Sequence, residues 1–113
     1  MKDDRLYLIH IKEVIERIEE YTQEGEEVFL EDHKTQDAVL RNLHTLAESS
    51  QRISKDLKAK HPQVDWRTLS AFRNVVVHDY LGISLDRIWD IIENDLPMLK
   101  RNITVILKTS ERQ

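Results

Sequence analysis

Apolar and charged residues alternate along this chain with the period of an α-helix, in four long stretches. The first stretch repeats an apolar residue every three to five positions, and lysine, arginine and glutamate side chains fill the gaps. Gly25 then ends the predicted helix, because glycine readily adopts the conformation in which helices terminate. The apolar positions are Leu6, Ile9, Val14, Ile15, Ile18 and Tyr21.

A second and longer amphipathic stretch follows a short apolar patch at residues 28–30. Asp32 can cap the helix at its N-terminus, and Pro62 closes it. Lysines near the end of this stretch suit the negative end of the helix dipole. We therefore predict one continuous helix with the apolar face Val39, Leu40, Leu43, Leu46, Ala47, Ile53 and Leu57.

The third stretch is capped by Asp65, is broken by Gly82 and carries Trp66, Leu69, Phe72, Val76 and Tyr80 on its apolar face.

In the fourth stretch Ser84 can cap a helix whose apolar residues step by three or four positions, a pattern suited to bundle packing. Pro97 lies inside it and should kink it near Glu93, because proline cannot donate the usual backbone hydrogen bond. The apolar positions are Leu85, Ile88, Ile92, Leu96, Leu99, Ile103 and Ile106.

A strand at residues 75–77 is the competing local prediction, because three consecutive valines favour extended backbone. We reject it, since a lone strand leaves its backbone groups unpaired and the chain offers no partner. The fold class is therefore all-α. We expect residues 1–113 to form a single domain, an up-and-down bundle of four main helices plus a short connecting helix.

Composition narrows the function classes. The 113 residues include 17 lysines and arginines, 21 acidic residues and no cysteine, which gives a net charge of −4. The absence of cysteine excludes disulfides, thiol nucleophiles and cysteine-ligated metals. No apolar stretch approaches the roughly 20 residues that cross a bilayer, and the N-terminus lacks signal-peptide character. We expect a cytoplasmic protein without membrane contact, and the acidic balance argues against broad nucleic-acid binding.

The densest polar cluster beside apolar residues is the run Arg73-Asn74-Val-Val-Val-His78-Asp79-Tyr80. Arg73 and His78 are five positions apart, which separates them by about 140° around a straight helix. They can act on one small group only if the helix unwinds at His78, or if a second copy of the chain brings its own run alongside.

These residue types suit cleavage of RNA without a metal. A histidine near its ordinary pKa of about 6.5 can accept the proton of a 2′-hydroxyl, which DNA lacks. Arg73 would hold the phosphate and stabilise its developing charge, and Asn74 would orient His78 or bind the phosphate. The plainer interpretation is a solvated arginine, a histidine placed at a helix end by the dipole, and a partly buried Tyr80.

Two further sets of polar residues lie outside this run. Arg41, Asn42 and Glu48 interrupt the second apolar face and predict either a polar layer facing the third helix or a solvated flank. The other histidines are scattered, and only His44 pairs with an acid at helical spacing, namely Glu48. We therefore expect no metal site.

The run from Arg73 to Tyr80 resembles the Arg-x4-His-x-Tyr signature of the HepT-like HEPN ribonuclease toxins. The resemblance covers residues 3–107 and includes, in order and spacing, residues 35–43, Glu48, residues 61–67 and residues 89–97.

The resemblance implies a helical homodimer in which two such runs face each other and form one RNA-cleaving cleft. Arg73 and His78 are then the catalytic pair and Asn74 supports them. No cofactor is needed for cleavage, and the substrate is RNA, with tRNA and mRNA as candidates.

The resemblance also implies a type VII toxin–antitoxin pair. The partner antitoxin is a minimal nucleotidyltransferase that uses ATP and Mg²⁺ to attach AMP to Tyr80. Added phosphate charge and bulk two residues from His78 would block the cleft. The alternative is a catalytically silent helical module that binds a nucleotide or the nucleotidyltransferase.

Overall fold

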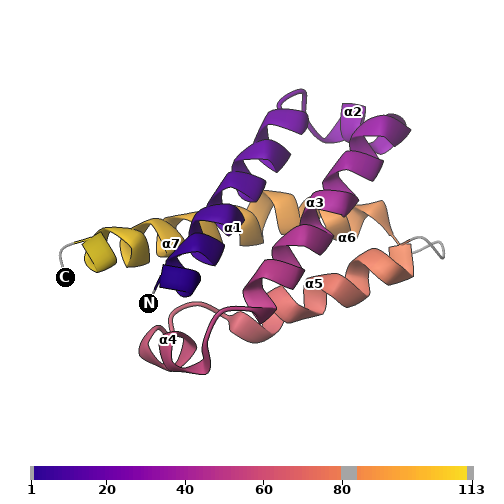
Figure 1. Cartoon of the computed structure of the whole chain (residues 1–113). Helices are drawn as coiled ribbons and strands as arrows, with labels where there is room; N and C mark the ends of the chain where they lie inside the picture. The colour runs from indigo at the N-terminus through magenta and orange to yellow at the C-terminus, as the bar shows by residue number, and fades with distance from the viewer. Residues whose placement is uncertain (1, 80–83, 112–113) are drawn as a thin grey trace.

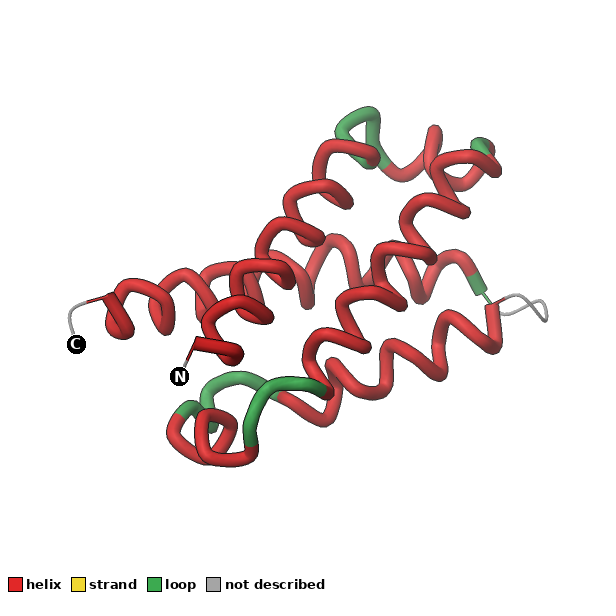
Figure 2. The backbone as a smooth tube through the Cα atoms, viewed as in Figure 1, coloured by secondary structure: helices red, strands yellow, loops and turns green. Residues whose placement is uncertain are grey.

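The computed structural model describes residues 2–79 and 84–111, and all the regular structure within them is helical (Figures 1 and 2). The elements are α1 (Lys2–Tyr21), α2 (Glu26–Glu31), α3 (His33–Gln51), α4 (Lys55–Lys60), α5 (Trp66–Asp79), α6 (Leu85–Asp90), a π-helical segment η1 (Ile91–Asp95) and α7 (Leu96–Glu111). The prediction of an all-α fold is confirmed. Residues 75–77 are helical, so the rejection of a strand there is confirmed as well.

Helices α1 and α3 run antiparallel and lie side by side (Figure 1). Asp4 near the start of α1 meets Ser54 beyond the end of α3, and His10 meets Ser49 one turn further in. Between these contacts and the far end, both helices bury aliphatic residues in the core that the whole bundle shares. The pairing places polar side chains of α1 next to those at the end of α3.

The buried stripe of α1 agrees with the predicted one at Val14, Ile15 and Ile18 and differs from it at the two ends. Leu6 is 62% exposed and Tyr21 is 42% exposed, so neither belongs to the core. Leu8 and Ile11, which the prediction left out, extend the buried stripe toward the N-terminus. The stripe follows Asp4, whose buried carboxylate fixes how the first turn faces α3.

Asp32 and Asp65 cap their helices as predicted. Asp32 accepts hydrogen bonds from the Thr35 hydroxyl and the Lys34 N–H at the start of α3. Asp65 accepts from the hydroxyl and the N–H of Thr68 in the first turn of α5. In both cases the hydroxyl bond is the main reason that the aspartate pKa lies below its ordinary value. Each cap fixes where its helix begins.

The predicted second helix is broken, which corrects the expectation of one helix up to Pro62. The α-helix stops at Gln51 and a new one starts after Ser54. The Ser54 N–H and hydroxyl donate to the Asp4 carboxylate at 2.8 and 2.6 Å, and the Ser54 oxygen accepts from the Leu57 N–H. A buried carboxylate needs such donors, so the contact with α1 overrides the local helical pattern.

The predicted fourth helix is also divided, into α6, η1 and α7. The Leu96 N–H bonds to the Ile91 carbonyl, five residues back, which is the π-helical pattern. Pro97 follows at once and has no N–H to offer the Glu93 carbonyl, so the irregularity lies where the proline predicted a kink. Ser84 precedes α6, but its side chain makes no capping hydrogen bond, contrary to the prediction.

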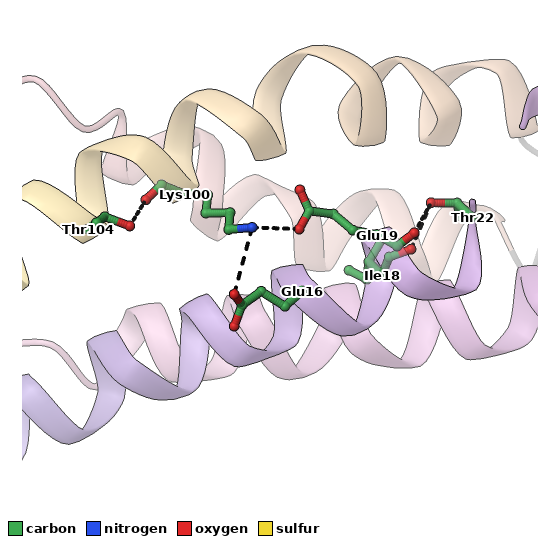
Figure 3. A network of polar contacts seen from close by, with 6 residues as sticks. All are labelled: Glu16, Ile18, Glu19, Thr22, Lys100 and Thr104. Atoms are coloured by element: carbon green, nitrogen blue, oxygen red, sulfur yellow. Dashed lines mark hydrogen bonds and ion pairs between the residues drawn. The ribbon is translucent and has the colours of Figure 1, made fainter.

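Helix α7 packs antiparallel to α1 and is fastened by charged contacts (Figure 3). The Lys100 ammonium lies 2.8 Å from the Glu19 carboxylate and 3.7 Å from that of Glu16. The hydrogen bond to Glu19 is the main reason that the pKa of Lys100 is raised. Further along, the Arg5 guanidinium donates to the Leu107 carbonyl at 3.3 Å. Within the described part of the chain, no helix is long and apolar enough to span a membrane.

Candidate functional site

Helix α5 presents Arg73 and Asn74, the first two polar residues of the run, on the side away from the core. Leu69 and Phe72 are buried, whereas Arg73 and Asn74 are exposed. The helix continues through Asp79, which includes the backbone of His78. Tyr80, the predicted modification position, lies outside the described residues. The structure thus fixes one catalytic candidate in full and the backbone position of the second.

The helical backbone decides between two ways of bringing Arg73 and His78 together. One was that the helix unwinds at His78, but the backbone is α-helical there and at Asp79. Their positions are therefore about 140° apart around one straight helix. The backbone therefore does not unwind locally at His78 within this chain.

Arg73 is paired with a carboxylate from the neighbouring helix α3. The Arg73 Nε lies 3.7 Å from the Glu48 Oε1, and the His44 Nε2 lies 3.5 Å from the same oxygen. The Arg73 side chain is 50% exposed, so solvent screens the pair and its contribution to stability is small, about 0–1 kcal/mol. The pair orients the guanidinium, and in the described residues no contact engages its Nη groups.

The predicted polar layer of Arg41, Asn42 and Glu48 forms only in part. Glu48 faces α5, which was one of the two alternatives. The Asn42 amide donates to the Ala38 carbonyl of its own helix, and Arg41 is exposed on the surface. Only one of these three side chains therefore contacts the catalytic candidates in the described structure.

A groove between α1 and α3 lies beside the Arg73–Glu48 ion pair and has a volume of about 320 Å³. The His10 Nδ1 and the Ser49 hydroxyl lie 2.9 Å apart and join its walls. The groove was missed in the sequence because His10 and Ser49 are 39 positions apart, and only the pairing of α1 with α3 brings them together. Its walls include Tyr7, His10, His44, Glu48, Ser49 and Arg52.

Histidines and carboxylates do not gather into a metal site in the part of the chain that is described. No group of three or more such residues there is placed to hold a metal ion. His10 bonds to a serine, and His44 pairs with a single glutamate.

Comparisons with known proteins agree on one family. The family model described as "Ribonuclease HepT-like" matches residues 11–106. A protein of Thermococcus cleftensis named "Probable ribonuclease HepT" is 42% identical over 95 residues, covering 83% of this chain and 86% of that protein. A protein of Methanocaldococcus jannaschii named "Putative RNase MJ0127" is 36% identical over 111 residues, covering 97% and 92%. No solved structure matched the chain.

Proposed function

The chain belongs to the ribonuclease HepT-like family, and we propose that it is an endoribonuclease whose single cleft is built by two copies of the chain. The observation that carries the two-copy site is the uninterrupted α-helix from Trp66 to Asp79. It separates Arg73 from His78 around the helix, whereas two facing helices related by two-fold symmetry can bring Arg73 of one copy to His78 of the other.

The proposed reaction is internal attack by the ribose. The His78 imidazole accepts the proton of the 2′-hydroxyl as the O2′ attacks the adjacent phosphorus. The bond from phosphorus to the 5′-oxygen breaks, and the 5′-oxygen takes up the proton from the His78 imidazolium, which returns to its neutral form. The products are a 2′,3′-cyclic phosphate and a 5′-hydroxyl, so no water and no metal enter this step. Arg73 stabilises the negative charge on the phosphate oxygens.

Glu48 serves as a positioning residue in this scheme. Its carboxylate holds the Nε side of Arg73 at 3.7 Å and leaves the Nη donors for the phosphate. Arginine presents its donors in a rigid fork, so fixing one side orients the other. Asn74 is exposed next to Arg73 on α5 and is assigned to the phosphate or to the orientation of His78.

Two experiments together test the reaction. RNA carrying one 2′-deoxy substitution at the cleaved step should resist cleavage, because the nucleophile is missing. Purified His78→Ala should lose cleavage by about 10²–10⁴-fold while its melting temperature is unchanged. Cleavage of the deoxy substrate, or a folded and fully active His78→Ala, would contradict the assignment. Activity should persist in EDTA.

Regulation by a nucleotidyltransferase completes the proposed toxin–antitoxin function. Tyr80 follows the catalytic histidine by two positions, so attached AMP would add negative charge and bulk beside the cleft and compete for Arg73. The partner enzyme would supply ATP and Mg²⁺; the toxin itself would need neither.

Intact-mass measurement tests this regulation. The protein co-expressed with its nucleotidyltransferase should gain mass in steps of one AMP, mapped to the peptide that contains Tyr80. Tyr80→Phe should gain none and should stay toxic beside the antitoxin. Silencing of Tyr80→Phe by the partner would show that control runs through binding instead.

A further inference from the structure

We propose that the groove between α1 and α3 is a subsite for a nucleotide of the RNA strand that flanks the scissile phosphate. This inference rests on the proposed ribonuclease function and extends it to substrate recognition. The groove lies beside the catalytic pair, because Glu48 forms part of its wall and also contacts Arg73. A strand whose phosphate sits on Arg73 therefore has this groove as its neighbouring surface.

The chemistry of the walls matches a single-stranded nucleotide. Tyr7, His10 and His44 offer ring faces on which a base can stack, and all three side chains are half-buried. Arg52 is exposed at the end of α3, where its guanidinium can pair with a phosphate. The volume of about 320 Å³ lies at the lower end of the range for small-ligand pockets, which is the scale of one nucleotide.

Hydrogen bonding inside the groove leaves groups for a ligand. Ser49 is 6% exposed, and its hydroxyl meets the His10 Nδ1 at 2.9 Å. This contact fixes the ring, and among the described residues no hydrogen bond engages its Nε2 edge. A base carbonyl, a ring nitrogen or a phosphate oxygen can meet that edge. The negative charge of Glu48 is paired with Arg73, which lessens its repulsion of a phosphate.

Two substrates separate the subsite from the catalytic centre. A dinucleotide supplies the scissile step alone, whereas a single-stranded RNA of about ten nucleotides with the same step also fills the flanking groove. Arg52→Ala removes the exposed cation, and Tyr7→Leu removes the aromatic face while keeping an apolar side chain. Arg101→Ala, an exposed arginine of α7, is the matched control.

The expected result is a loss confined to the longer substrate. Arg52→Ala and Tyr7→Leu should each lower its kcat/KM by about tenfold, mainly through KM, and leave dinucleotide cleavage unchanged. Tyr7→Phe keeps the ring and should stay close to wild type, as should Arg101→Ala. Equal losses on both substrates, or no loss on either, would overturn the subsite while the ribonuclease function stands.

Binding measured without cleavage keeps the two proposals distinguishable. In the His78→Ala background, adding Arg52→Ala should weaken binding of the longer RNA and reduce the salt dependence of its association constant by about 0.7 in log–log slope, the value for one phosphate on a single strand. An unchanged slope contradicts the subsite. A wild-type protein that binds RNA through the groove but cleaves neither substrate would refute the ribonuclease and leave the groove as an RNA-binding surface only.

Discussion

Two cations in this molecule, Lys100 and Arg73, each pair with glutamate side chains of a neighbouring helix. On the α1–α7 side, Lys100 is 30% exposed and lies between two carboxylates, with its closest contact at 2.8 Å (Figure 3). On the α3–α5 side, Arg73 is 50% exposed and meets a single carboxylate at 3.7 Å, which it shares with His44. The first cation has its charge matched within the fold. The second has no contact to its Nη groups among the described residues.

A charged residue that faces a neighbouring helix does not by itself stabilise the fold. Lys100 holds two helices whose register is also set by the bond from Arg5 to the Leu107 carbonyl. Arg73 follows Phe72, a buried residue that already anchors α5 in the core. Helix α5 therefore does not need the pair with Glu48 for its packing.

The largest effect is expected on the α3–α5 side. Glu48→Gln removes the charge that holds Arg73 and should lower kcat by about tenfold with little change in melting temperature, because a misoriented group loses transition-state stabilisation. Cleavage kinetics and a thermal melt measure both quantities. Glu48→Asp should restore part of kcat. Glu19→Gln on the α1–α7 side is the matched control and should leave kcat unchanged.

A smaller effect is expected on the α1–α7 side, and it concerns stability and not cleavage. Lys100→Met should cost about 0.5 kcal/mol, or roughly 2 °C in melting temperature, and leave cleavage intact. Since the Lys100 pKa is raised in the folded protein, its stabilisation is full below the ordinary value of 10.5 and is lost as pH rises through the raised value. If the wild type and Lys100→Met had the same melting temperature at neutral pH and low salt, the stabilising role of the Lys100 ion pairs would be refuted.

The smallest effect concerns the caps that position these helices. The pKa of Asp65 lies below its ordinary value of 3.8, so its stabilising bonds to Thr68 are present above that pH and weaken as pH falls through the lowered value. Asp65→Asn keeps a capping oxygen and should flatten the acid limb of the stability curve with little change at pH 7. An identical acid limb in both proteins would contradict the assignment.

Local signals in the sequence predicted much of this fold. Asp32 and Asp65 cap the helices that they were predicted to cap, because capping involves only the next few residues. The apolar steps from Ile88 to Ile106 fall in the core, because the helical period is the same in isolation as in the bundle. The proline at position 97 likewise marked an irregularity through its own missing N–H.

Features that depend on distant partners were not predictable. The break before α4 exists because Ser54 binds Asp4, 50 positions away, and no window around Ser54 contains that carboxylate. The sequence left open whether Glu48 and Asn42 face the third predicted helix or solvent; Glu48 contacts that helix, whereas Asn42 turns to its own backbone. The α1–α3 groove forms only where these two helices pack together, and its wall residues are far apart in the sequence.

A mixed dimer tests the central claim most directly, namely that one cleft is built by two copies. Arg73→Ala and His78→Ala chains carrying different tags would be co-expressed, and dimers holding both tags would be assayed on RNA. Each parent homodimer should be inactive. The mixed dimer retains one arginine and one histidine on opposite copies, so its cleavage should exceed that of either parent by about 100-fold. A mixed dimer as inactive as its parents, beside an active wild type, would show that one copy supplies both residues.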